Sequence, residues 1–235
     1  MKKKIRIFLF SLILFLNSNT FGNNLNSEIQ PEPSSKQTNK LVKEKKSKNF
    51  IIVTANDYAS FLGYKILEKG GTVADAAVTI QLALGLVEPQ SSGLGGGTFI
   101  TLFENKSKKI LSFEGREKAP KEIKQNIFLK SNGEPKKFFE AAIGGASVGV
   151  PSTLKTLFTL HKKYGKLSWQ EIITPVIQLS KEGFFPPNRL VNALKKEFFF
   201  FKIYPDSNYK KIIKEPNKKF FNKDYTRTLE EISKN

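Results

Sequence analysis

Residues 73–87 limit how this chain can fold more than any other segment, because nearly every position in them is apolar. A helix with one apolar face can lie on a surface, but a helix that is apolar all round has to be covered on every side. The many alanines in the segment indicate that neighbouring elements approach closely. We therefore predict a central buried helix, which Pro89 ends.

The segments around this helix alternate between strand-like and helix-like patterns. The apolar run 50–53 predicts a short buried strand, and Asp57 is placed to cap a helix that follows it. The runs 98–103 and 109–113 predict a β-hairpin. Further helices are predicted from Pro151 to about Gly165, after the capping-box residues 168–171, over about 188–200, and from about Thr226.

The composition excludes several classes of site. The chain has no cysteine, so disulfides, iron–sulfur clusters and thiolate zinc sites are ruled out. His161 is the single histidine, which excludes a histidine-rich metal site and leaves a Ser-His-Asp triad only if His161 itself serves in it. We predict no metal and no cofactor. The net charge of +18 fits a solvated basic surface, which we favour, or an anionic partner.

The N-terminus has the layout of a secretory signal peptide over residues 1–22. Lysines and an arginine precede an apolar run at 7–16, and small and polar residues follow it. The run is shorter than the roughly 20 residues that span a bilayer, although an uncleaved anchor is the alternative. Residues 23–48 are polar and charged and predict a disordered linker, so the folded region is expected over 49–235. We predict a periplasmic or secreted protein.

Three stretches of sequence carry a family signal. The first reads GGTVADAAV at 70–78 and continues as LVEPQSSGLGGGTF at 86–99, the second is REKAP at 116–120, and the third is GVPS at 149–152 followed by KYGKLSW at 163–169. In order and spacing they resemble the start of the large subunit of the γ-glutamyltransferases (glutathione hydrolases). Thr72 and Ser152 depart from the resemblance, since the family usually has Asn and Gly there.

The resemblance implies an α+β fold over 49–235, an incomplete part of the αββα sandwich of the N-terminal nucleophile hydrolases. Family members continue far beyond the length of this chain, and strands of the small subunit complete their sandwich. We therefore expect the chain to be an N-terminal fragment that exposes apolar surface. Its expected partners are γ-glutamyl substrates such as glutathione and the missing C-terminal portion, which could be encoded separately.

The resemblance also implies the chemistry. In the family an N-terminal threonine, freed by self-cleavage, attacks the γ-glutamyl amide, and its own α-amino group serves as the base. That threonine lies in a Thr-Thr-His-like stretch, whereas the only histidine here, His161, follows Leu160. No catalytic residue is therefore assigned in this chain, and the chain alone is predicted to be inactive.

Arg116 is the one substrate-binding residue that the resemblance assigns. It matches the family arginine that holds the α-carboxylate of the substrate, and a guanidinium fork suits a carboxylate at any working pH. The alternative is a structural arginine that pairs with Glu114 or Glu117.

Other conspicuous residues favour structural roles. The glycine loop 93–97 follows a helix and precedes a strand, the reverse of a nucleotide-binding loop, so we expect close backbone packing near the active site. Asp75 is interpreted as a core carboxylate whose hydrogen bonds are satisfied, and His161 as a core or rim residue. The run 198–201 of phenylalanines is interpreted as core.

Two alternative functions stay open at this point. One is a non-catalytic remnant or binding protein that keeps part of the fold. The other is a basic nucleic-acid binder, which the signal peptide and the lack of a clustered basic and aromatic stripe disfavour.

Overall fold

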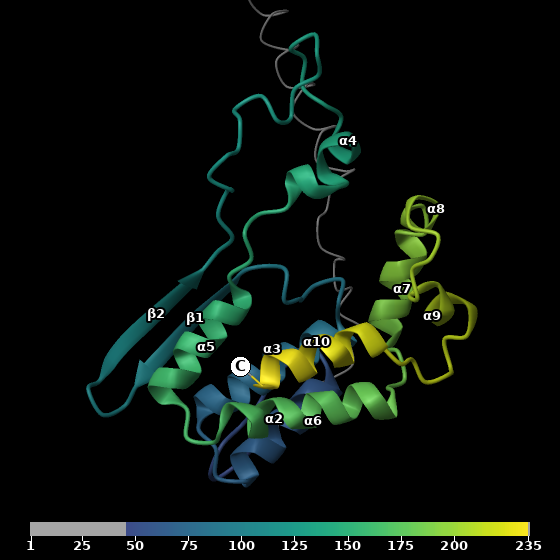
Figure 1. The fold of residues 1–235 in the computed structure, drawn as a ribbon. Helices are drawn as coiled ribbons and strands as arrows, with labels where there is room; N and C mark the ends of the chain where they lie inside the picture. The colour runs from purple at the N-terminus through teal and green to yellow at the C-terminus, as the bar shows by residue number, and fades with distance from the viewer. Residues whose placement is uncertain (1–45, 235) are drawn as a thin grey trace, which may run out of the picture. The chain divides into compact units, whose positions relative to one another are not determined.

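The computed structural model describes residues 46–234, which belong to one compact unit. The predicted signal peptide and nearly all of the predicted linker lie outside the described residues. The described part mixes helices with one antiparallel hairpin, as expected for an α+β chain (Figure 1). No helix within 46–234 is long and apolar enough to cross a membrane.

The centre of the fold is helix α3, Val73–Val87, and this confirms the prediction of a buried helix. Helices α2 (Asp57–Glu68), α5 (Thr153–Tyr164) and α6 (Trp169–Glu182) pack against it. Its N-terminus has a reciprocal capping box, in which Thr72 and Asp75 each bond the backbone N–H of the other. The side chains of Val78, Leu82, Leu86 and Val87 are fully buried.

Helix α10, Lys223–Lys234, lies along α6 and closes the core from the C-terminal side (Figure 1). Tyr225 donates from its hydroxyl to the carbonyl oxygen of Leu82 at 2.8 Å, which joins α10 to the middle of α3. The indole N–H of Trp169 donates to the carbonyl oxygen of Ile232 at 3.0 Å. These two hydrogen bonds fix the position of α10 along α3 and α6.

The hairpin consists of β1, Thr98–Glu104, and β2, Lys109–Gly115, paired from Thr98↔Gly115 to Glu104↔Lys109. One face packs against α5, while the other exposes Phe99, Phe103 and Ile110, which are 66%, 57% and 73% accessible. Apolar residues on both faces are typical of a strand pair covered on both sides. Among the described residues this two-stranded sheet is the only sheet, and the larger sandwich stays a prediction.

The shorter elements complete the chain. They are α4 (Phe138–Ala142), the 3₁₀ turn η1 (Gly145–Ser147), α7 (Asn188–Lys196), α8 (Phe200–Ile203) and α9 (Lys210–Lys214).

The prediction of a buried strand at 50–53 is wrong. These residues form no strand, and Ile51 and Val53 are exposed, because no strand within residues 46–234 lies beside them. The segment instead runs along α2, where the ring of Phe50 lies 5.5 Å from that of Tyr64. The cap of α2 is Asn56, whose side chain accepts from the N–H of Tyr58, so Asp57 is the first helical residue.

Three helix boundaries in the structure also differ from those predicted from the sequence. The helix expected to start at Pro151 begins at Thr153, and the last helix begins at Lys223 instead of Thr226. The single helix expected over 188–200 ends at Lys196, and a separate short helix follows from Phe200.

The interpretation of the phenylalanine run 198–201 as core is wrong in part, because the helix is interrupted there. Phe201 is buried, but Phe198 and Phe199 are 52% and 36% exposed. Phe199 makes an edge contact with Phe139 and a tilted contact with Phe200, in an aromatic group outside the main core.

We expect Leu82→Ala to lower the free energy of unfolding by about 2–5 kcal/mol, because it leaves a cavity in a fully buried site. Ile110→Ala is the matched control, since Ile110 is largely exposed, and should change it by less than about 0.5 kcal/mol. Urea unfolding followed by far-UV circular dichroism measures both. Equal effects of the two substitutions would contradict the central position of α3.

Candidate functional site

Arg116 directly follows β2, in a backbone segment that is fixed from the opposite side. Lys118 and Val150 form an antiparallel bridge, with N–H···O distances of 2.8 and 3.4 Å. The hydroxyl of Ser152 donates to the carbonyl oxygens of Gly115 and Arg116 at 2.9 and 2.7 Å. The main chain at Arg116 is therefore held by residues 150–152, while its side chain remains 66% accessible.

The guanidinium of Arg116 pairs with Glu117, with 3.3 Å between its Nη1 and the carboxylate Oε2. The structural pairing considered from the sequence is thus present for Glu117. It uses one edge of the guanidinium, whose five N–H donors leave others free for a ligand. Pairing with Glu117 and binding of a carboxylate ligand are compatible in this geometry.

From the sequence, Glu117 was considered only as an alternative ion-pair partner of Arg116, which it adjoins in the REKAP stretch. Its side chain lies against two glycines: a Cβ at Gly97 would come within 2.5 Å of Oε2, and one at Gly149 within 2.9 Å of the Glu117 Cβ. Apart from the ion pair with Arg116, the buried Oε2 accepts no hydrogen bond from the described residues. The glycines leave the space in which Glu117 sits beside Arg116.

Within the glycine loop, the prediction of close backbone packing is confirmed at Gly97. A Cβ there would also lie 2.7 Å from the carbonyl oxygen of Gly115, whereas a Cβ added at Gly93 or Gly95 would meet no atom within 4 Å. The loop is also tied to α5, because the N–H groups of Ser152 and Thr153 donate to the carbonyl oxygen of Gly96 at 3.2 Å.

A cavity of about 300 Å³ opens beside Arg116. It lies between the end of β2, the segment before α5 and the first turns of α5. Its lining consists of Phe113, Glu114, Arg116, Lys118, Val150, Pro151, Ser152, Lys155, Thr156 and Thr159. Among residues 46–234 no group of three or more carboxylate or histidine side chains could hold a metal ion.

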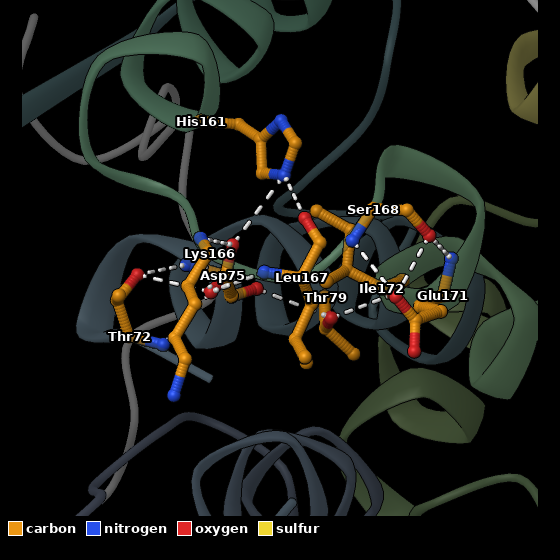
Figure 2. A network of polar contacts seen from close by, with 9 residues as sticks. All are labelled: Thr72, Asp75, Thr79, His161, Lys166, Leu167, Ser168, Glu171 and Ile172. Carbon is orange, nitrogen blue, oxygen red and sulfur yellow. Dashed lines mark hydrogen bonds and ion pairs between the residues drawn. The ribbon is translucent and has the colours of Figure 1, made fainter. Parts of the chain in front are cut away.

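Asp75 lies at the centre of a second polar network, drawn in Figure 2. Its carboxylate is fully buried and accepts from the N–H and hydroxyl of Thr72 and from the N–H groups of Lys166 and Leu167, at 2.8–3.4 Å. This confirms the interpretation of Asp75 as a satisfied core carboxylate. The network joins the start of α3 to the turn between α5 and α6.

His161 belongs to the same network and is a rim residue, as predicted. Its side chain is 12% exposed, with Nε2 2.9 Å from the carbonyl oxygen of Leu167 and 3.4 Å from Asp75 Oδ1. A carbonyl oxygen only accepts hydrogen bonds, so Nε2 carries the proton. Because that nitrogen is committed to this network, His161 has a structural role.

Comparison with known proteins agrees with the family resemblance that the REKAP segment carries. The sequence model of the family described as Gamma-glutamyltranspeptidase matches residues 59–235. The chain belongs to this family. The matched region includes Arg116, Glu117 and the glycine loop.

Curated relatives of this family member include the glutathione hydrolase proenzyme of Bacillus subtilis (strain 168), 40% identical over 147 residues, which are 63% of this chain and 25% of the relative. The glutathione hydrolase proenzyme 1 of Schizosaccharomyces pombe is 31% identical over 192 residues, 80% of this chain and 29% of the relative. The chain thus spans about a quarter of the length of these relatives.

Solved structures of the family give the same result for the fold. The γ-glutamyltranspeptidase of Helicobacter pylori is similar with a TM-score of 0.74 and 31% identity, over 81% of this chain and 56% of that one. The enzyme of Pseudomonas nitroreducens, complexed with L-DON, gives 0.71 and 26%, over 80% and 56%.

We expect Asp75→Asn to lower the free energy of unfolding by about 1–3 kcal/mol, because an amide presents an N–H₂ where backbone N–H groups point at a carboxylate oxygen. Asp57→Asn is the control, since Asp57 is exposed and should cost less than about 1 kcal/mol. Urea titration of both variants measures the difference. An unchanged stability of Asp75→Asn would refute the role given to the buried carboxylate.

Gly97→Ala should lower stability by about 1–3 kcal/mol, because its Cβ would overlap with Glu117 and with the carbonyl oxygen of Gly115. Gly95→Ala provides the matched comparison in the same loop, where the added methyl meets no atom within 4 Å, and should change stability by under about 1 kcal/mol. Thermal melts of the two variants would decide, and equal melting temperatures would argue against the packing described.

Proposed function

We propose that this chain is the large-subunit start of an exported γ-glutamyltransferase or glutathione hydrolase. The enzyme would cleave the γ-glutamyl amide bond of substrates such as glutathione and pass the γ-glutamyl group to water or to an amino acid. Family membership over residues 59–235 and the names of the curated relatives support this. The signal-peptide pattern at 1–22 supports a periplasmic or secreted location.

In this proposal Arg116 binds the α-carboxylate of the γ-glutamyl group. The observation that carries it is an accessible guanidinium at the edge of a cavity, on a main chain that Ser152 and the Lys118–Val150 bridge hold in place. A guanidinium whose main chain is fixed, and which keeps N–H donors beyond its ion pair with Glu117, can pair with a carboxylate through two parallel hydrogen bonds. Glu117 supports the guanidinium from its other side.

The nucleophile in this proposal is supplied by the remainder of the enzyme. A threonine hydroxyl would attack the γ-carbonyl carbon, the amine would leave with a proton, and water or an acceptor amine would then cleave the acyl ester. None of the 235 residues forms a Thr-Thr-His stretch. The exposed apolar face of the hairpin is a surface on which further chain could pack.

The test is a chimera in which residues 59–235 replace the matching stretch of the Bacillus subtilis enzyme. We expect Arg116→Gln to lower kcat/KM for γ-glutamyl-p-nitroanilide about 10- to 100-fold, mainly through KM, because a charged bidentate contact is lost. Arg116→Lys keeps the charge without the fork and should fall between the two.

Two controls accompany this test. The 235-residue chain by itself should release no p-nitroaniline, and release by it would show that a nucleophile is present after all. If Arg116→Gln leaves kcat/KM unchanged in an active chimera, the carboxylate-binding role of Arg116 is wrong. A chimera that folds but stays inactive would favour the alternative of a non-catalytic protein.

A further inference from the structure

We propose that the cavity beside Arg116 binds ligands that carry two separate carboxylates, and that Lys155 holds the second one. The inference deepens the proposed function and rests on it, since Arg116 takes the first carboxylate. Lys155 then acts as a specificity-determining residue, which favours γ-glutamyl substrates or acceptors with an additional acidic group.

The cavity has an excess of positive charge. Arg116, Lys118 and Lys155 line it, against the carboxylate of Glu114 in the lining and that of Glu117, which pairs with Arg116. Within the described part of the chain, the ammonium groups of Lys118 and Lys155 make no ion pair or hydrogen bond. Like charges that lie near one another repel, and an anionic ligand relieves that repulsion.

Lys155 occupies an unusual place for a cation. It lies in the first turn of α5, a 12-residue helix whose N-terminus has no acidic residue and no side-chain cap. The helix dipole makes this end positive, so an anion is favoured there and a lysine is disfavoured. An anion bound beside Lys155 would be stabilised by both the ammonium and the helix end.

The hydroxyl groups of the cavity are already engaged. Ser152 donates to the carbonyl oxygens of Gly115 and Arg116, Thr156 to that of Ser152, and Thr159 to that of Lys155. The side-chain donors left for a ligand are therefore the three cations. This arrangement selects for charge on the ligand and against neutral hydroxyl or amide groups.

The size and walls of the cavity fit a ligand with two charged ends. A volume of about 300 Å³ exceeds what a single carboxylate needs. Phe113, Val150 and Pro151 supply apolar wall for the methylene groups between the two ends. A short dicarboxylate is the simplest molecule with these properties.

The test compares glutarate, with two carboxylates, and butyrate, with one, by isothermal titration of the full chain at constant ionic strength. We expect glutarate to bind on the order of ten-fold more tightly than butyrate. Lys155→Met should remove this preference and leave butyrate affinity within about two-fold, while Lys155→Arg should retain it. Lys162→Met, on an exposed part of α5 away from the cavity, removes the same charge and should retain the preference as well.

Each other outcome decides against the proposal. Equal affinities for the two ligands, no binding of glutarate, or an equal loss of preference in Lys155→Met and Lys162→Met would overturn it. Thermal melts of each variant establish that it is folded. Arg116→Gln tests the role of Arg116 separately from that of Lys155. If this variant binds butyrate as tightly as the unchanged chain does, Arg116 does not bind the first carboxylate. The role of Lys155 is then judged from glutarate affinity alone.

Discussion

The buried carboxylate of Asp75 is the interaction on which the geometry of the cavity depends. It bonds the backbone at the start of α3 and the backbone N–H groups of Lys166 and Leu167, so it sets the position of the turn that joins α5 to α6. A buried charge without such partners would be strongly destabilising, which makes this arrangement of the two segments the favourable one. The position of α5 in turn fixes Ser152 and, through its hydroxyl, the main chain at Arg116.

The region around Arg116 combines a frame of main-chain hydrogen bonds with exposed charged side chains. The frame consists of the glycine loop, the bridge at Lys118 and the bonds of Ser152, all of which involve main-chain atoms. The charged side chains at its edge are largely solvated, and such groups have little effect on stability. They are therefore available for binding, and the long side chains can adjust to a ligand.

The sequence predicted the central helix and the hairpin well, because each has a strong periodic pattern and clear end signals. It also predicted the satisfied state of Asp75, since a carboxylate inside an apolar helix has to find hydrogen-bond donors. The strand predicted at 50–53 is wrong, because a short apolar run has the same sequence pattern whether or not a partner strand lies beside it. Arg116 came from a motif, whereas the contacts of Glu117 with Gly97 and Gly149 join distant segments that no local pattern brings together.

The bonds of Ser152 to two carbonyl oxygens have a consequence for how the ligand preference of this chain can change. Because the shape of the cavity is maintained by main-chain atoms and one hydroxyl, substitutions at Lys118 or Lys155 leave its architecture intact. Under the proposal for Lys155, single replacements at such positions would change ligand preference without loss of folding. The same separation of scaffold from recognition makes the cavity an accessible target for engineering.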